Sequence, residues 1–334
     1  MGLNIVTSTE PLNVANIITL IYGDPGIWKT SLAFTAKRPI LFDFDKGAYR
    51  AANRKDSVQI AAWHEVATVS PQDLANYDTI IIDTAGRALD MITDTLKLDK
   101  RNTRRDGQLT MQGYGKLGGI FTDWLKMLRG MGKDIVLLAH TSEDKDGDNI
   151  IKRPDMVGGS KREAYKVADM MAYMTTQHSQ DGDIKTLNFV PHPAYLAKDS
   201  GQIGNVTVVP MTEAPSQLAD IIQATKDHIN SFSAEAAKAH QDLSDLRSEL
   251  MSAENAKGIN DLVAGLNPNH LLHDQMRRDI WNRAKAISTI EFDKASKQFV
   301  EVDDDFAPVL DLVDEAGESE QSQPTADSQQ LEEQ

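Results

Sequence analysis

Short apolar runs alternate with helix-like segments through the first two hundred residues, and this alternation constrains the fold more than any other feature. The apolar runs are 17–22, 39–44, 57–63, 79–83 and 134–140, and the helix-like segments between them are 29–37, 85–97 and 112–131. Several runs are apolar without alternation, as strands buried on both faces of a parallel sheet are. Strands alternating with helices predict a three-layer α/β domain with a mainly parallel central sheet.

The rest of the chain changes character twice. Runs at 185–190, 193–198 and 205–210 predict further strands, for which antiparallel pairing is one option, and residues 258–287 predict two amphipathic helices joined near Asn267-Pro268. The end of the chain is polar and acidic, a composition typical of disorder. We therefore predict an α/β domain over 1–212, a helical region over 213–305 and a disordered acidic tail over 306–334.

Composition limits the possible chemistry. The chain has no cysteine, which excludes disulfides, thiolate metal sites and a cysteine nucleophile. No apolar segment reaches the length of a membrane span, so we expect a soluble, cytoplasmic protein with no membrane partner. The net charge is −15, but residues 301–334 hold twelve Asp and Glu and no Lys or Arg, which leaves −3 for residues 1–300. The acidic balance therefore does not argue against a polyanionic partner.

One stretch, LIYGDPGIWKTSLAF (20–34), reads as a strand, a Gly/Pro turn and a helix start. Gly23, Lys29 and Thr30 fit the phosphate-loop spacing G-x-x-x-x-G-K-[ST], but Trp28 replaces the second glycine. An indole that points away from the phosphates would be tolerated, and a Gly-Pro turn before an ordinary helix is the alternative. The predicted phosphate-binding residues are Gly23, Asp24, Pro25, Gly26, Ile27, Trp28, Lys29, Thr30 and Ser31.

A carboxylate follows at the expected place. YDTIIIDTAG ends an apolar run in Asp83, about fifty residues after the loop, where phosphate-loop enzymes place the aspartate that coordinates Mg²⁺. The alternative is a turn-forming aspartate. Together the two motifs favour a nucleotide site in which Lys29 contacts the phosphates and Thr30 and Asp83 hold Mg²⁺.

Further motifs make residues 15–210 resemble the RecA/RadA class of ATPases, and in particular the short RecA-like recombination and single-strand annealing proteins of bacteriophages. ILFDFDKGAYRA resembles the second strand of that class and places Asp45 where a carboxylate, usually Glu, activates the attacking water. DIVLLAHTSED resembles the strand whose last polar residue senses the γ-phosphate, here His140. A strand-end turn aspartate and a structural histidine are the alternatives. The resemblance implies a RecA-like three-layer sandwich that uses ATP and Mg²⁺.

Two later segments continue the resemblance. MVGGSKREAYKVADMMAYM is similar to the end of the second DNA-binding loop of the class and the helix and strand after it. YLAKDSGQ is similar to the turn that projects basic residues into the ATP site of the neighbouring subunit, and Lys198 is the residue that matches. The resemblance thus implies a homo-oligomer, a ring or a filament, with its ATP sites between subunits.

Two basic segments are candidates for DNA contact. In LKLDKRNTRRDGQ we single out Lys100, Arg101, Arg104 and Arg105, in the slot of the first DNA-binding loop of the class. The second segment is the flexible-looking 145–162, with Lys152, Arg153, Lys161 and Arg162. Neither contains an aromatic platform, so contacts to the DNA backbone are favoured over base recognition. A solvated loop with charges of both signs is the alternative.

These observations predict an ATP-binding, RecA-like protein of phage type that binds single-stranded DNA in recombination or strand annealing, with DNA-stimulated ATP hydrolysis. If the chain is phage-encoded, its location is the cytoplasm of the host cell, and a single-strand-binding or replication protein is a further possible partner. Two alternatives stay open: a phosphate-loop kinase of small molecules, and a scaffold that binds nucleotide without turnover.

Overall fold

The structure is a computed structural model that describes residues 3, 5–147, 149–157, 159–179 and 182–302. The predicted acidic tail over 306–334 lies outside the described residues. The chain divides into two compact units, Met1–Gln241 and Asp242–Gln334. The boundary between the two units falls inside helix α6 (Gln217–Ser252). The sequence predicted the end of the α/β domain at 212/213, where the composition changes. No helix in the described residues is long and apolar enough to cross a membrane.

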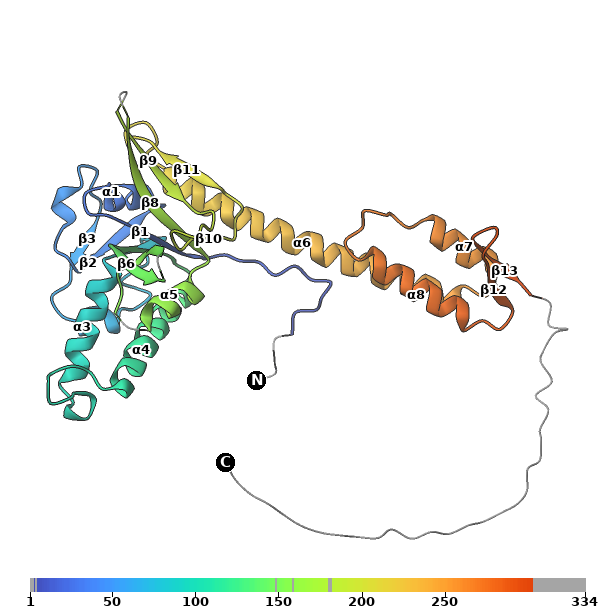
Figure 1. The fold of residues 1–334 in the computed structure, drawn as a ribbon, viewed down its shortest axis with the longest axis horizontal. Coiled ribbons are helices and arrows are strands. Elements are labelled where there is room, and N and C mark those ends of the chain that lie inside the picture. Colours follow the sequence, from blue (N-terminus) through green and yellow to red (C-terminus); the bar gives the residue numbers. More distant parts are fainter. Residues whose placement is uncertain (1–2, 4, 148, 158, 180–181, 303–334) are drawn as a thin grey trace, which may run out of the picture. The chain divides into compact units, whose positions relative to one another are not determined.

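A nine-stranded sheet forms the centre of the first unit (Figure 1). In spatial order its strands are β11 (Asn205–Val208), β9 (Gly182–Asn188), β8 (Met170–Ser179), β1 (Ile18–Gly23), β5 (Asp134–Ala139), β4 (Thr79–Asp83), β2 (Pro39–Asp43) and β3 (Ser57–Gln59), while β10 (Lys198–Asp199) pairs with β8. The strands from β8 to β3 pair in parallel, and β9, β10 and β11 pair antiparallel. The strands predicted over 17–22, 39–44, 79–83, 134–140, 185–190 and 205–210 are confirmed, and so is the mainly parallel sheet. Of the predicted run 57–63 only 57–59 is a strand, and of the run 193–198 only Lys198 lies in one, β10.

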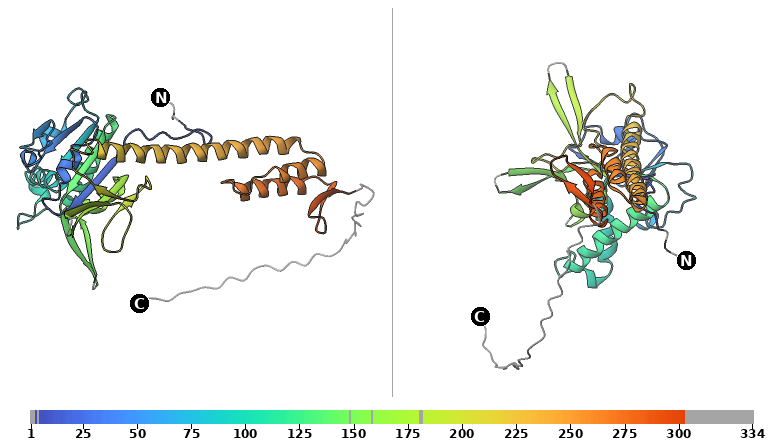
Figure 2. Two further views of the ribbon diagram at one scale, coloured as in Figure 1. Left: turned by 90° about the horizontal axis from the view of Figure 1, so that it is seen from above. Right: turned by 90° about the vertical axis from the view of Figure 1, so that its right-hand side faces the viewer.

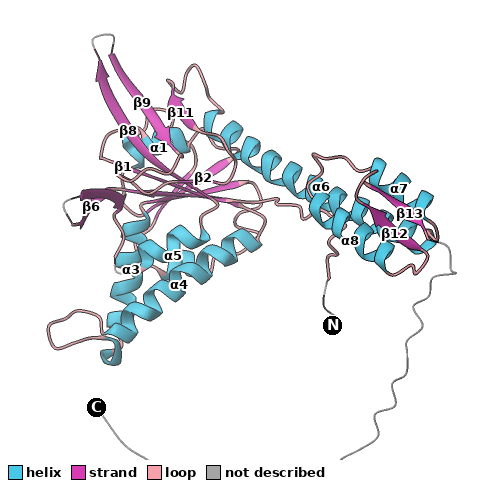
Figure 3. Cartoon of the chain, turned by 45° about the vertical axis from the view of Figure 1, so that its right-hand side comes forward, coloured by secondary structure: helices cyan, strands magenta, loops and turns pink. Residues whose placement is uncertain are grey.

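Helices cover both faces of this sheet, which gives the predicted three layers (Figure 3). The helices of the first unit are α1 (Lys29–Ala33), α2 (His64–Ala67), α3 (Ala85–Lys97), α4 (Met111–Gly130), α5 (Ser160–Val167) and the first part of α6. Two short turns of 3₁₀-helix are η1 (Ala48–Arg50) and η2 (Lys100–Asn102). Successive residues of β4 point to opposite faces. Ile82 packs with α3, α4 and α5 in one core, whereas Ile81 packs with α1 and α6 in the other.

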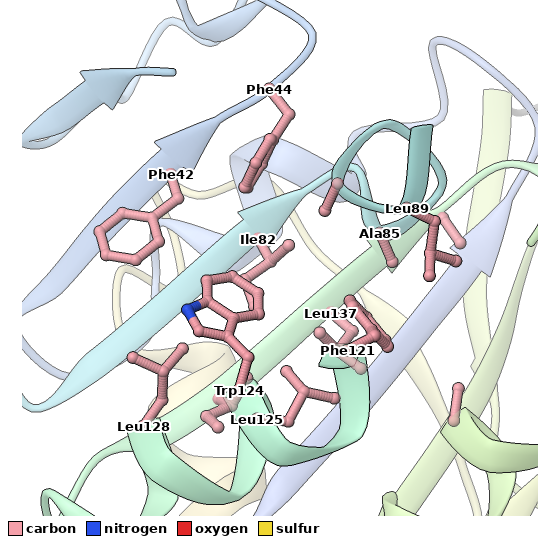
Figure 4. Packing of buried hydrophobic residues seen from close by; sticks show 14 of the residues in the cluster. Phe42, Phe44, Ile82, Ala85, Leu89, Phe121, Trp124, Leu125, Leu128 and Leu137 are labelled. Atoms are coloured by element: carbon pink, nitrogen blue, oxygen red, sulfur yellow. The ribbon is translucent and has the colours of Figure 1, made fainter. Parts of the chain in front are cut away.

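Trp124 of α4 fills the centre of the first core (Figure 4). Its ring meets Trp63 edge-on at a centroid distance of 4.9 Å, and Phe44 at 6.3 Å. Its indole N–H donates to the carbonyl of Val66 at 2.9 Å, so the buried polar atom is satisfied. This packing fixes the end of β2, and with it the start of the loop that carries Asp45.

Residues 141–154 differ from the expectation. The sequence predicted a flexible basic loop over 145–162, but β6 (Thr141–Asp146) and β7 (Asn149–Pro154) form an antiparallel hairpin, followed by α5. Glu143 lies directly opposite Lys152 and pairs with it, a cross-strand contact that stabilises the hairpin register. Figure 2 shows this hairpin and the β8–β9 ribbon projecting from the sheet as separate arms.

The second unit contains the end of α6, α7 (Ala256–Ala264), α8 (His273–Lys285) and the hairpin of β12 (Ile290–Asp293) and β13 (Gln298–Glu301). Its core includes Leu246, Ile259, Ile280 and Phe299. The two helices predicted over 258–287 are confirmed. The β12–β13 hairpin was not predicted from the sequence.

Candidate nucleotide site

The loop between β1 and α1 begins at Gly23, the last residue of β1. A β-carbon on Gly23 would come within 2.5 Å of the carbonyl oxygen of Met174 and of a methyl carbon of Ile27, so only glycine fits there. Gly26 has φ 80° and Trp28 has φ 75°, both in the left-handed region. These conformations turn the chain sharply from the strand into the helix, as a loop that surrounds a phosphate requires.

The side chains of Lys29 and Thr30 face the inside of this loop. The Lys29 ammonium is buried and donates to the carbonyls of Gly23 at 2.9 Å and Asp24 at 2.7 Å, and burial lowers its pKa. The Thr30 hydroxyl donates to Asp83 Oδ2 at 2.7 Å. The loop thus holds one cation and one hydroxyl, beside a carboxylate from the end of β4.

Asp83 and Thr30 offer the hard oxygen donors that Mg²⁺ prefers. Burial raises the pKa of Asp83, with the Thr30 hydroxyl acting against the rise. A cation at this position would favour the ionised form of Asp83, and few water molecules would compete for it. The described residues contain no cluster of three His, Asp or Glu that could hold a metal alone. The pair therefore fits a cation that also takes oxygens from a phosphate group.

Trp28 occupies the position of the missing glycine and adopts the left-handed backbone that a glycine would have there, at φ 75° and ψ 18°. Its indole is 43% exposed, and the Lys185 ammonium of β9 lies 3.9 Å from its ring centroid. A cation over an indole is favourable by about 0.5–1 kcal/mol at an exposed site, which offsets part of the cost of the backbone. The loop therefore has the same turn with tryptophan as with glycine at this position, and the indole ring lies against β9.

A second group of polar side chains lies around a cavity of about 660 Å³. Asp45 follows β2 and His140 follows β5, and His140 Nε2 lies 3.7 Å from Asp45 Oδ2. Arg87 of α3 lies 3.3 Å from Asp45 Oδ1. The contacts with His140 and then Arg87 hold the pKa of Asp45 below its ordinary value despite partial burial. Asp45 is therefore an ionised carboxylate that could orient a water and take its proton.

Parallel pairing explains why these groups meet. Gly23, Asp43, Asp83 and Ala139 are the last residues of four strands, and the carboxyl ends of parallel strands lie on one edge of the sheet. Within the sheet β5 lies between β1 and β4, so His140 follows the strand between the phosphate loop and Asp83.

Comparison with known proteins found a family and a solved structure that are similar to this chain. Residues 15–200, more than half of the chain, match a family model described as an AAA domain. The chain belongs to this AAA domain family. A KaiC-like protein from the hyperthermophilic archaeon Pyrococcus horikoshii OT3 is similar over 58% of this chain and 89% of its own, with 12% identity and a TM-score of 0.35. No curated protein matched the sequence.

The family match confirms the predicted phosphate-loop ATPase core, and the mainly parallel sheet between two layers of helices confirms the predicted three-layer sandwich. ATP and Mg²⁺ are the usual ligands of phosphate-loop ATPases, and the loop, Thr30 and Asp83 of the AAA domain match that use. Two residues that support the site were not predicted. Arg87 is three residues after Thr84, at the start of the helix that follows Asp83. Asp43, fully buried, accepts from the backbone N–H groups of Gly47 and Ala48 and so holds the loop of Asp45.

Lys198 lies elsewhere in the AAA domain. In β10 it pairs with Met171 near the start of β8, whereas Gly23 of the phosphate loop is level with Met174, three residues or about 10 Å further along that strand. Its ammonium donates to the carbonyl of Ala168 at 2.6 Å. The fold therefore does not bring Lys198 to the site of its own chain, and its action on a neighbouring subunit stays a prediction.

The first basic segment connects α3 to α4. It is well organised: the buried Asn102 side chain donates to the Leu96 carbonyl and accepts from the Lys116 ammonium. Arg101 pairs with Asp99 at 2.8 Å. The exposed cations of this loop that make no ion pair with any described residue are Lys100, Arg104 and Arg105. The thirteen residues of α3, about 20 Å, separate the loop from Asp83.

The second basic segment is largely neutralised by its own hairpin. Lys152 pairs with Glu143, while Asp144 pairs with Arg153 at 3.3 Å and with Lys161 at 3.2 Å. Arg162 is exposed and makes no ion pair with a described residue. Three of the four cations predicted to contact DNA here would have to leave a carboxylate first.

Proposed function

We propose that this AAA domain protein hydrolyses ATP when it binds single-stranded DNA, and that it acts in recombination or strand annealing of the phage type. The observation that supports hydrolysis best is the convergence of Lys29, Thr30, Asp83 and Asp45 at one edge of the sheet, with Asp45 facing an open cavity. A scaffold that only bound nucleotide would have no use for an ionised carboxylate held by both an arginine and a histidine.

Each residue has a role in this reaction. Mg²⁺–ATP, when bound, would supply a polarised γ-phosphate. Lys29 would exchange its two loop carbonyls for the phosphates and place its charge on them, and Thr30 and Asp83 are the residues that would hold the cation. Asp45 orients the attacking water and accepts its proton, and His140 and Arg87 fix the direction of the carboxylate.

Support for DNA binding comes from the loop between α3 and α4. It presents Lys100, Arg104 and Arg105 to solvent, with no carboxylate of the described residues paired to them, on a backbone held by the buried Asn102. Each cation that meets a phosphate releases counterions and so gives salt-dependent affinity. We propose further that Lys198 completes the ATP site of a neighbouring copy in a ring or filament.

The decisive test is the rate of ATP hydrolysis of the full chain with and without a single-stranded oligonucleotide. We expect stimulation by DNA, its loss in Arg104→Ala/Arg105→Ala with the DNA-free rate unchanged, and no activity in Lys29→Ala. The control is Arg54→Ala/Lys55→Ala, which removes two adjacent exposed cations outside the loop. Transfer of phosphate to a small-molecule acceptor would favour a kinase, and nucleotide binding without turnover would favour a scaffold.

A further inference from the structure

We propose that the C-terminal unit contains a separate binding site for single-stranded nucleic acid, in the groove between α8 and the β12–β13 hairpin. The proposal rests on the proposed function, because the ligand is the same, and it adds a contact outside the AAA domain. The groove has a cavity volume of about 800 Å³. It is built entirely from residues of the second unit.

The groove has an aromatic floor. Trp281 of α8 and Phe292 of β12 are each 38% exposed, and their ring centroids are 5.1 Å apart. Phe299 of β13 is buried beneath them, 5.4 Å from Trp281 and 5.2 Å from Phe292. Large aromatic rings that stay exposed beside a cavity are the surfaces on which unpaired bases stack. The α3–α4 loop and the β6–β7 hairpin of the first unit contain no aromatic residue in their sequences.

Cations line the rim of the groove. Arg277 and Arg278 come from α8, and Lys294 and Lys297 come from the hairpin. All four are exposed, and none pairs with a carboxylate of the described residues. Asp274 is the one acidic residue of the described lining. The groove therefore has a local positive charge in a chain whose net charge is −15.

The order of these groups along α8 distinguishes a nucleic acid from a simple anion. Arg277, Trp281 and Lys285 follow each other at intervals of four residues, so they lie on one side of the helix with steps of about 6 Å. The Lys285 ammonium lies 5.6 Å from the Trp281 ring centroid. A cation, an aromatic ring and a cation in a row match the alternation of phosphates and bases in a single strand. An acidic peptide would use the cations alone.

The first experiment measures binding of a labelled oligothymidylate to the full chain at several salt concentrations. Arg277→Ala/Lys297→Ala removes two groove cations, and Lys238→Ala/Lys257→Ala is the matched control, since both of its lysines are exposed, unpaired among the described residues and outside the groove. We expect the groove variant to bind on the order of tenfold more weakly at 0.1 M salt, with a salt slope smaller by about 1.4, and the control to resemble the wild type.

The second experiment separates stacking from charge. Trp281→Leu keeps an apolar side chain, so it should bind oligothymidylate at least about fivefold more weakly and bind an abasic oligonucleotide of equal length as the wild type does. Trp281→Phe restores a ring and should recover most of the affinity. Equal losses for both oligonucleotides would show a site for anions in general, such as an acidic peptide, and would overturn the proposal.

Comparison with the α3–α4 loop keeps the two proposals distinguishable. If Arg104→Ala/Arg105→Ala loses binding while both groove variants match the control, the groove proposal is wrong and the proposed function stands. If the groove variants lose binding and the loop variant does not, the groove proposal stands and the loop assignment is wrong. A wild-type chain that binds no oligonucleotide would overturn both.

Discussion

Trp28 and Gly26 share the left-handed backbone that a phosphate loop requires, with φ 75° and 80°. A β-carbon on Gly26 would meet no atom within 4 Å, so Gly26→Ala would cost only the backbone preference. We expect Gly26→Ala to lower the free energy of unfolding by about 1 kcal/mol. Trp28→Gly and Trp28→Ala both lose the contact with Lys185, and we expect the glycine variant to be the more stable by a similar amount. Urea unfolding of the three variants measures this, and an alanine variant as stable as the glycine variant would contradict it.

Asp45 is expected to act in turnover and not in nucleotide binding. Asp45→Asn should bind ATP normally but hydrolyse it at least about a hundredfold more slowly, whereas Asp83→Asn should weaken both, because it removes the partner of the cation. Binding is measured with a fluorescent ATP analogue and turnover by phosphate release. Wild-type turnover in Asp45→Asn would show that Asp45 only shapes the turn.

The lowered pKa of Asp45 gives a pH dependence with a defined sign. Its contacts with His140 and Arg87 contribute stability above the ordinary pKa of an aspartate, and this contribution is lost as the pH falls through the lowered value, below 3.8. The carboxylate therefore stays ionised from pH 8 to pH 5, and its protonation should not reduce turnover in that range. A loss of turnover centred between pH 5 and 6 that Arg87→Ala shifts upwards would contradict this.

At the scale of elements, the sequence best predicted those helices and strands whose formation depends on the burial of apolar residues. The limits of β4 (Thr79–Asp83) and α3 (Ala85–Lys97) agree with the predicted ranges residue for residue, because β4 is buried throughout and α3 is amphipathic. The β6–β7 hairpin was missed because its strands are rich in charged residues and are mostly partly buried or exposed, and their pairing depends on ion pairs between residues about ten apart. The contact of Arg87 with Asp45 was missed because it depends on which strands are neighbours in the sheet.

The two basic elements are expected to contribute unequally to DNA binding. Lys152 and Arg153 must first leave Glu143 and Asp144, whereas Arg104 and Arg105 make no ion pair with described residues. Lys152→Ala/Arg153→Ala should therefore change the salt slope of oligonucleotide binding by much less than the roughly 1.4 expected for Arg104→Ala/Arg105→Ala. Equal changes in slope would show that DNA displaces the carboxylates.

At the scale of the whole molecule, the positions of Lys198 and the phosphate loop lead to a prediction about assembly. The two lie about 10 Å apart along β8, and Lys198 contacts Ala168 in its own chain. A contact that joins one face of a subunit to a different face of the next repeats as a ring or filament. If Lys198 completes the neighbour's site in this way, Lys198→Ala and Lys29→Ala should each be nearly inactive alone, since every site lacks one of the two groups.

Mixing these two variants should restore activity. A working site needs the phosphate loop of a Lys198→Ala subunit beside the Lys198 of a Lys29→Ala subunit, which random assembly of equal amounts provides at about a quarter of the interfaces. We therefore expect about a quarter of the wild-type rate of ATP hydrolysis. The control is a mixture of Lys29→Ala with Asp45→Asn, which should stay inactive because both changes lie on the same side of the interface, and no site then has both groups intact. A Lys198→Ala mixture as inactive as this control would show that Lys198 does not act between subunits.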